Sequence, residues 1–215
     1  MKKNFSSQGL LVIISAPSGA RKTSILSELL ARYPDIRFSV SVTTRDPREN
    51  ERDGINYNFV SEEAFDRHID NGDFVEWAVV HGKRYGTLKK TIQDVLHNNQ
   101  ILILDTDTFG AFNIKNLYQD AVMIFIVPPS LEVLSERLHR RNTESDELIQ
   151  KRLEVAPHEM ARMSEYDYIV LNDTIPQAVI RIRTIIEAEK LRNSRIIPSL
   201  TSWREYINGS EKSND

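Results

Sequence analysis

The segment from residue 10 to residue 23 reads LLVIISAPSGARKT. It opens with an apolar run rich in branched side chains, which is typical of a strand buried on both faces. A turn with proline and glycine follows, and apolar side chains then recur on one helical face at Ile25, Leu26 and Leu29. Strand, turn and helix in this order favour a loop that binds phosphate with backbone N–H groups at a helix N-terminus.

The turn carries part of the pattern of a phosphate-binding loop. The strict pattern has glycine at its first and sixth positions, where this chain has Ala16 and Arg21, and the following Lys22 and Thr23 match it. Lys22 would bridge the phosphates of ATP, and the Thr23 hydroxyl would bind Mg²⁺. On this segment alone, a turn without a ligand stays open. The expected ATP-binding residues are Ala16, Pro17, Ser18, Gly19, Ala20, Arg21, Lys22 and Thr23.

Strands and helices alternate along most of the remaining chain. Apolar runs predict strands at residues 101–104, 122–127 and 168–171. Helical periodicity predicts helices at residues 109–118, 131–141, 145–156 and 175–192. Such alternation indicates an α/β fold with a parallel sheet flanked by helices. Three strands that lie close together in sequence are predicted at residues 38–44, 57–60 and 74–80, with a short helix at 61–71. We expect them to form a small mixed lobe inserted into the core.

Composition narrows the class of protein and its partners. The chain has 215 residues, which suits one domain. Its net charge of −3 gives no general positive field for nucleic acid or an acidic membrane, and no stretch is long enough to span a membrane. The absence of cysteine excludes disulfides and thiolate chemistry and fits a cytoplasmic location. The apolar run after Lys3 is too short for a secretory signal, and the sequence indicates no oligomeric state.

Further motifs along the chain resemble those of guanylate kinases. They are SVSVTTRDPR at 39–48, DGINYNFV at 53–60, EWA at 76–78, HGKRYGT at 81–87, IVPPSL at 126–131 and YDYIVLND at 166–173. The resemblance covers roughly residues 9–192, with the motifs in the family's order. It implies a single domain of three parts. The P-loop NTPase core covers about 9–37 and 99–192, the GMP-binding lobe about 38–98, and the helical lid about 137–152. Residues 193–215, which end in the polar run NGSEKSND, are expected to form a flexible tail.

The resemblance implies transfer of the γ-phosphate of ATP to GMP, and to dGMP, with Mg²⁺ as cofactor. Arg45 and Arg48 carry the bidentate donors that clamp a phosphate. Tyr57 and Tyr85 can donate their hydroxyls to the same phosphate. The implied GMP-binding residues are Ser41, Arg45, Arg48, Tyr57, Glu76, Tyr85, Thr87 and Asp107.

Guanine presents N1–H and N2–H₂ donors side by side, and a carboxylate accepts both. Glu76 fits this role, with Asp107 as a second acceptor and the Thr87 hydroxyl as a partner for O6. Adenine lacks the donor pair and would leave Glu76 unpaired. Taken singly, Glu76 could instead be a solvated charge on a strand edge.

Phosphoryl transfer depends mostly on positioning and on neutralising charge. The resemblance implies catalytic roles for Lys22, Arg45, Arg137, Arg141 and Arg152. Arg137 and Arg141 are spaced i, i+4 and share a helix face, which could also be a solvated basic surface. Asp105 closes a predicted strand, where it could hold Mg²⁺ through water together with Thr23, or simply cap a helix.

The chain departs from the family pattern mainly on the ATP side. Arg21 and Arg140 stand where glycines are usual, and Pro157 is expected to kink or end its helix. If residue 21 needs a positive φ, a side chain there costs roughly 1–2 kcal/mol. Arg21 could crowd ATP or attract its phosphates. A binding module without catalysis is therefore the second hypothesis, but the pair Glu76 and Asp107 favours the enzyme and disfavours a kinase for another nucleotide.

Overall fold

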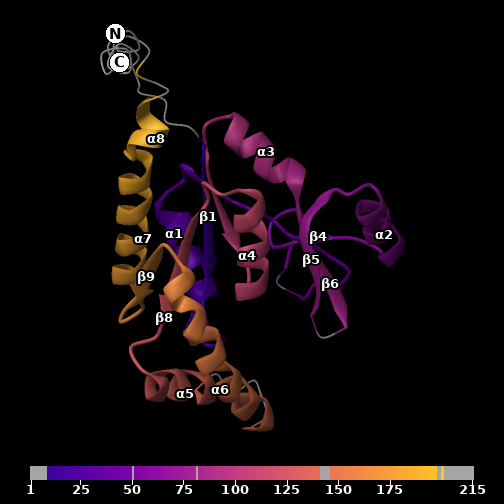
Figure 1. Ribbon diagram of the computed structural model, residues 1–215. Coiled ribbons are helices and arrows are strands. Elements are labelled where there is room, and N and C mark those ends of the chain that lie inside the picture. Colours follow the sequence, from indigo (N-terminus) through magenta and orange to yellow (C-terminus); the bar gives the residue numbers. More distant parts are fainter. Residues whose placement is uncertain (1–8, 50, 81, 141–145, 198–199, 201–215) are drawn as a thin grey trace.

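The computed structural model describes residues 9–49, 51–80, 82–140, 146–197 and 200. Within them, five parallel strands form the main sheet in the order β2-β7-β1-β8-β9 (Figure 1). Their bounds are β1 (Leu10–Ser15), β2 (Ile36–Phe38), β7 (Ile101–Asp105), β8 (Val122–Val127) and β9 (Tyr168–Leu171). The predicted α/β class with a parallel sheet is confirmed.

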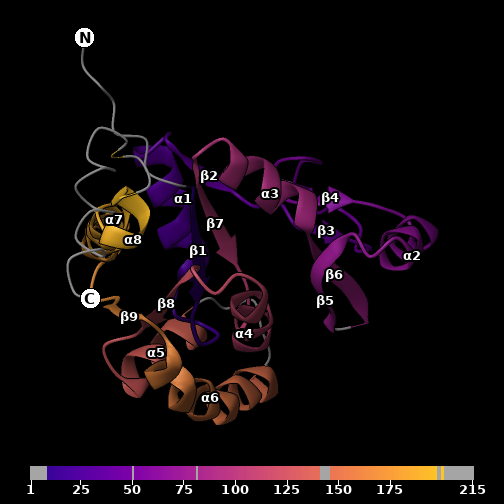
Figure 2. The same cartoon turned by 45° about the horizontal axis from the view of Figure 1, so that its top comes forward.

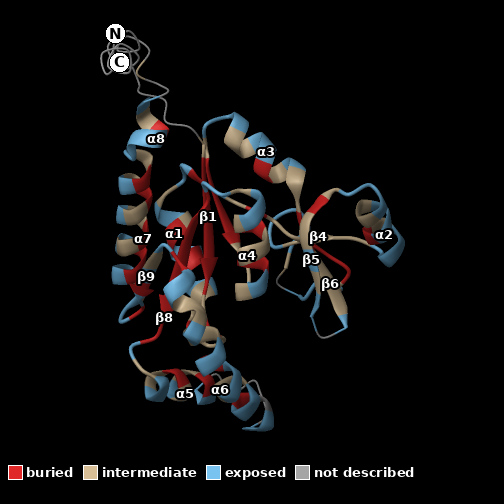
Figure 3. Ribbon diagram, in the orientation of Figure 1, coloured by how far each residue is buried: buried red, intermediate tan, exposed pale blue. Residues whose placement is uncertain are grey.

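Helices cover both faces of this sheet (Figure 2). Leu10, Val12 and Ile14 of β1 pack with α1 (Lys22–Arg32) and α7 (Ile175–Lys190). Leu11 and Ile13 pack on the other face with α3 (Lys89–His97) and α4 (Thr108–Leu117). Successive side chains of a strand point to opposite faces, so the continuous apolar run of β1 fills both cores. Figure 3 shows β1 as buried throughout.

A second, smaller sheet lies beside the first, in the order β4-β3-β6-β5 (Figure 1). Its elements are β3 (Val42–Thr43), β4 (Asn58–Phe59), β5 (Phe74–Val80), β6 (Lys83–Leu88) and α2 (Glu62–Asp70). Val42, Phe65 and Phe74 form its small core. The Ser61 Oγ accepts a hydrogen bond from Ala64 N at 3.2 Å, which confirms the predicted helix cap.

Two helices, α5 (Leu131–His139) and α6 (Asp146–Ala161), pack together below the main sheet in Figure 1. Leu134 and Leu138 of α5 meet Ile149 and Ala156 of α6. The 3₁₀ helix η1 (Arg162–Glu165) continues from α6, and α8 (Asn193–Ile196) follows α7. In the described part of the chain, no helix combines the length and the apolar character needed to cross a membrane.

Four local predictions differ from the structure. The single strand expected at 38–44 is divided between two sheets, because β2 pairs with β7 whereas β3 pairs with β4 and β6. Neither β6 nor α3 was predicted, and α3 covers the main sheet through Ile92 instead of belonging to the lobe. Pro157 does not end α6, which continues to Ala161. Ala156 before the proline and Met160 after it both pack against hydrophobic cores, and this packing holds the helix on either side of it. The expected tail begins as α8, with Arg195 buried, and residues 201–215 lie outside the described residues.

Candidate active site

The phosphate loop connects β1 to α1 at the carboxyl end of the main sheet, the edge where open α/β sheets bind ligands. A cavity of about 600 Å³, the loop cavity, is lined by all eight residues from Ala16 to Thr23 and by residues of α6. A neighbouring cavity of about 380 Å³, the lobe cavity, lies between the two sheets. Lys22 and Asp107 line both cavities.

The loop holds Lys22 at the end of β7. Its Nζ donates to the carbonyl oxygen of Thr106 at 2.9 Å and forms an ion pair with the carboxylate of Asp105. Gly19 has φ +90°, and a Cβ there would come within 2.7 Å of the Leu138 side chain. The loop therefore lies close against α5. Arg21 has φ +63°, so the position does require the left-handed backbone that favours glycine.

Helix α6 contacts the loop through two charged side chains. Arg152 Nη1 donates to Ser18 Oγ at 2.7 Å, and the backbone N–H of Ser18 donates to Glu159 Oε2 at 3.3 Å. Burial raises the pKa of Glu159, against the opposing effects of the Ser18 hydrogen bond and Lys22. Glu159 was not predicted. The only feature of the sequence that could have pointed to Glu159 is its spacing, because it lies two helical turns after Arg152 and so on the same face of the helix.

The lobe cavity brings together most of the side chains that the sequence assigns to GMP. Ser41, Tyr57, Glu76, Tyr85 and Asp107 line it, facing Lys22 and Asp105 of the core. Tyr57 and Tyr85 stack edge to face with their ring centres 5.8 Å apart. The lobe therefore presents two tyrosines and an acidic pair to one space.

Glu76 and its partners form the buried acidic end of this cavity. Thr87 is buried behind Glu76 and donates its Oγ1 to Glu76 Oε1 at 2.9 Å. Burial raises the pKa of Glu76, the charge of Asp107 adds to this, and the Thr87 hydrogen bond opposes it. Asp107 also caps α4, since its Oδ1 accepts from Gly110 N at 2.8 Å.

Gly110 lets α4 approach this acidic pair. A Cβ at this position would lie 2.2 Å from Thr106 Oγ1 and 3.4 Å from both Glu76 Oε2 and Asp107 Oδ1. No side chain larger than glycine fits without displacing these groups. The sequence showed the glycine but not the contact that requires it.

Arg45 and Arg48 do not line the lobe cavity. Arg45 Nη2 donates to both carboxylate oxygens of Glu51 at 2.8 Å, and the backbone N–H of Arg48 donates to Glu51 Oε2 at 2.9 Å. The hydrogen bond from the backbone of Arg48 lowers the pKa of Glu51, and the hydrogen bond from the Arg45 side chain lowers it by a smaller amount. The Arg45 guanidinium lies 5.4 Å from the centre of the Tyr57 ring, so it is adjacent to the cavity through that tyrosine. Glu51 was not predicted.

The remaining predicted arginines of the lid lie elsewhere. Arg137 Nη2 donates to the carbonyl oxygen of Asn172 at 3.0 Å, and Arg137 lines a third cavity next to Arg21 instead of the loop cavity. Arg141 lies outside the described residues. Helix α5 ends at His139, with Arg140 as its cap.

The donors for Mg²⁺ are of the right kind. Mg²⁺ binds through one or two carboxylates, with substrate phosphates and water completing its shell. Asp105 at the end of β7 lines the lobe cavity, Thr23 lines the loop cavity, and Lys22 next to Thr23 is ion-paired to Asp105. Among the described residues, no group of three or more acidic or histidine side chains forms a complete protein cage. This set fits a Mg²⁺ that arrives with a nucleotide.

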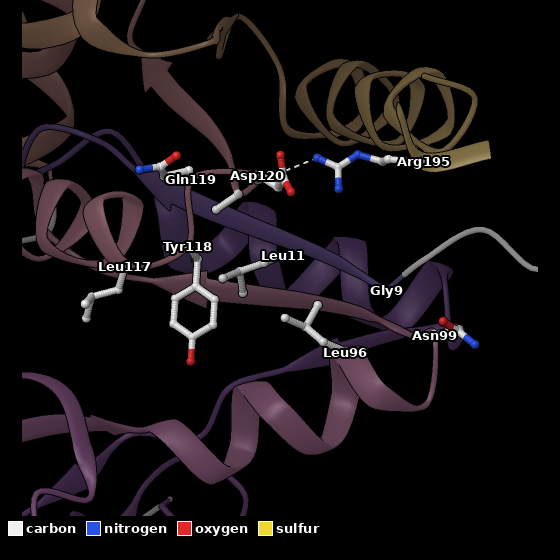
Figure 4. Close-up of a pocket in the computed structure, with 10 residues that line it drawn as sticks. Gly9, Leu11, Leu96, Asn99, Leu117, Tyr118, Gln119, Asp120 and Arg195 are labelled. Atoms are coloured by element: carbon white, nitrogen blue, oxygen red, sulfur yellow. Dashed lines mark hydrogen bonds between the residues drawn. The ribbon is translucent and has the colours of Figure 1, made fainter. Parts of the chain in front are cut away.

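A separate cavity of about 570 Å³ lies at the opposite end of the sheet (Figure 4). It is lined by Gly9 and Leu11 at the start of β1, by Leu96 of α3 and by Arg195 of α8. Arg195 Nη2 donates there to the carbonyl oxygen of Asp120. No predicted site residue lines it, so it is distinct from the loop and lobe cavities.

Comparison with known proteins decides the family. The guanylate kinase family profile matches residues 8–189. This chain belongs to the guanylate kinase family. It is 44% identical over 187 residues to the guanylate kinase of Desulfitobacterium hafniense, covering 87% of this chain and 94% of that protein. It is 46% identical over 196 residues to the guanylate kinase of Syntrophotalea carbinolica, covering 91% of each.

A solved structure agrees with the guanylate kinase assignment. The crystal structure of guanylate kinase from Anaplasma phagocytophilum matches with a TM-score of 0.71 and 34% identity, covering 88% of this chain and 90% of that one. The resemblance read from the motifs is thereby confirmed over most of the chain, and the P-loop core is the fold of a guanylate kinase.

Proposed function

We propose that this chain transfers the γ-phosphate of ATP to GMP, with ATP in the loop cavity and GMP in the lobe cavity. One observation carries the proposal: the two cavities meet at Lys22 and Asp107. Two nucleotides bound there would bring their phosphates together at Lys22. Phosphoryl transfer needs this in-line positioning more than it needs covalent chemistry.

The loop side supplies the contacts for ATP. Backbone N–H groups of residues 16–23 would cradle its phosphates at the start of α1, and Lys22 would bridge them. Arg152, held at Ser18, lies where it can approach the same phosphates from α6. Mg²⁺, when bound, would neutralise phosphate charge, with Thr23 and Asp105 as the protein groups that hold it. A role for Arg137 and Arg141 in neutralising the transferred group stays a prediction.

The lobe side supplies the contacts for GMP. Glu76 and Asp107 would accept the N1–H and N2–H₂ donors of guanine, and Thr87 orients Glu76 through its hydrogen bond. Tyr57 and Tyr85, with Ser41, would hold the phosphate end, and Arg45 and Arg48 would close on it after releasing Glu51. A cytoplasmic location belongs to the same proposal.

A coupled assay of ADP release tests this function. Protein, ATP and Mg²⁺ are combined with GMP, dGMP, AMP or UMP in turn. We expect turnover with GMP and dGMP and background rates with AMP and UMP, because only guanine satisfies the acidic pair. GMP binding measured by calorimetry without turnover would instead identify a binding module that has lost catalysis.

A further inference from the structure

A third cavity, of about 280 Å³, lies beside the phosphate loop and against α5. We call it the arginine pocket, and its lining consists of Arg21, Val133, Glu136, Arg137 and Arg140. Three guanidinium groups and one carboxylate give this lining a formal charge of about +2. Like charges gathered in one cavity repel each other unless an anion compensates them.

The protein neutralises only part of the positive charge of this pocket, through Glu136. Nη1 of Arg137 is buried and has no hydrogen-bond partner. The guanidinium groups of Arg21 and Arg140 make no hydrogen bond or ion pair within the described part of the chain. Burial lowers the pKa of Arg137, and the charges of Arg21 and Arg140 lower it further. Buried donors without partners are costly, so this arrangement calls for a ligand.

Two of the three arginines come from different elements. Arg21 precedes α1 in the phosphate loop, and Arg140 caps the end of α5. Arg21 keeps its side chain although its backbone is left-handed, with φ +63°. The fold places both side chains on one cavity, next to Arg137.

We propose that Arg21, Arg137 and Arg140 form an anion subsite that takes a phosphate group. Guanidinium groups suit this ligand, because their forked N–H donors match the oxygens of a phosphate. The subsite adjoins the loop cavity, since Arg21 lines both. The phosphate has two sources: the chain of a bound ATP, or free inorganic phosphate. Only the first source rests on the proposed function.

Charge-removing variants test the subsite. Arg21→Gln and Arg140→Gln remove the charge but keep a polar side chain. Because glutamine also has a Cβ, Arg21→Gln leaves the strain of the left-handed backbone at this position unchanged. Arg37→Gln, at an exposed arginine of β2, is the matched control for net charge. Calorimetry measures two affinities in each protein: that for ATP with Mg²⁺, and that for inorganic phosphate when the protein is already saturated with ATP and Mg²⁺.

Each source gives its own result. If the subsite takes a phosphate of ATP, the affinity for ATP falls about tenfold in Arg21→Gln and in Arg140→Gln, as expected for one lost charged hydrogen bond. Inorganic phosphate then does not bind the ATP-saturated protein. If the subsite takes free phosphate, the affinity for ATP is unchanged, and phosphate binds the ATP-saturated wild type and Arg37→Gln but neither pocket variant.

The proposal is overturned if both pocket variants match Arg37→Gln in both measurements, or if they bind ATP more tightly than the wild type. The second result would mean that Arg21 obstructs the loop. Failure of the proposed function is separate, because the wild type would then release no ADP from ATP when GMP is the acceptor, whatever the pocket variants do.

Discussion

At the residue scale, Arg21 combines an unfavourable backbone with a charged side chain that lines the loop cavity. Its φ of +63° lies in the region that non-glycine residues avoid, at the residue that precedes α1. Such a conformation persists only where the surrounding structure imposes it. The strain and the charge of Arg21 can be separated by substitution, because glycine relieves the first and glutamine removes only the second.

Arg21→Gly is expected to stabilise the protein by about 1 kcal/mol. The left-handed backbone costs about 1–2 kcal/mol with a side chain, and the greater freedom of glycine in the unfolded state offsets part of the gain. Urea unfolding measures the change. Asn99→Gly, at the other described non-glycine residue with positive φ (+54°), is the control and should gain less, because asparagine tolerates this backbone better. A loss of stability in Arg21→Gly would show that its side chain holds the loop in place.

Glu76→Gln is expected to change how stability depends on pH. Burial raises the pKa of Glu76 in the folded protein above its usual value of 4.5. The folded state therefore favours the protonated form: the contribution of Glu76 is complete below pH 4.5 and is lost as the pH rises through the raised pKa. The free energy of unfolding of the wild type, minus that of Glu76→Gln, should fall over this range in urea titrations. A constant difference across the series would contradict the burial of this carboxylate.

At the element scale, α4 is fitted against β5 through Gly110. Gly110→Ala is expected to lose about 1–3 kcal/mol of stability, because its Cβ overlaps Thr106 and presses on the acidic pair. The KM for GMP should rise while the KM for ATP stays close to that of the wild type. Asn116→Ala, on the exposed side of the same helix, is the control. Equal changes in both KM values would argue against a specific effect on Glu76 and Asp107.

Helix α6 places the carboxylate of Glu159 on a backbone donor of the loop. The backbone N–H of Ser18 donates to Glu159, so a phosphate of ATP bound at the loop would compete with the ionised carboxylate for this donor and be repelled by it. Glu159→Gln should therefore tighten ATP binding about fivefold, equivalent to about 1 kcal/mol. Because burial raises the pKa of Glu159, this advantage should shrink as the pH falls through that pKa. Glu154→Gln, exposed on the same helix, should have no such effect.

Elements with strong apolar patterns could be predicted from the sequence, and those defined by pairing could not. The runs that form β1, β7 and β8 are apolar throughout, because both of their faces are buried. By contrast, β6 reads KRYGTL, and only its pairing with β3 and β5 makes it a strand. The stretch at 38–44 contains no residue that marks its division between two sheets.

At the scale of the whole molecule, the lobe cavity is lined by residues of both sheets, so GMP should stabilise both together. GMP at a hundred times its Kd is expected to add about 2.7 kcal/mol to the free energy of unfolding. Urea unfolding of a Trp203→Phe variant, followed by far-UV circular dichroism and by the fluorescence of Trp77 in β5 of the lobe, should shift as a single transition. AMP at the same concentration should leave it unchanged. A shift in the fluorescence transition alone would mean that GMP contacts only the lobe.

The candidate site was predicted in part for the same physical reason. Side chains with the chemistry and motif of a binding site can be picked out from the sequence, and Glu76 and Tyr57, picked in this way, line one cavity. Side chains that act on those residues depend on distant parts of the chain meeting, and their identity is only visible in the fold. Glu51, Glu159 and the contact of Gly110 with Thr106 are of this second kind.

On the proposed function, Glu51 would be a tethered competitor for the phosphate of GMP. It accepts hydrogen bonds from the Arg45 guanidinium and from the backbone N–H of Arg48, and its short tether keeps it at a high effective concentration there. An incoming phosphate would have to displace it, so the affinity for GMP would be lower than the contacts alone would give. A departing product would leave donors that Glu51 recaptures at once. Affinity would thereby be exchanged for faster release, which favours turnover wherever product departure limits the rate.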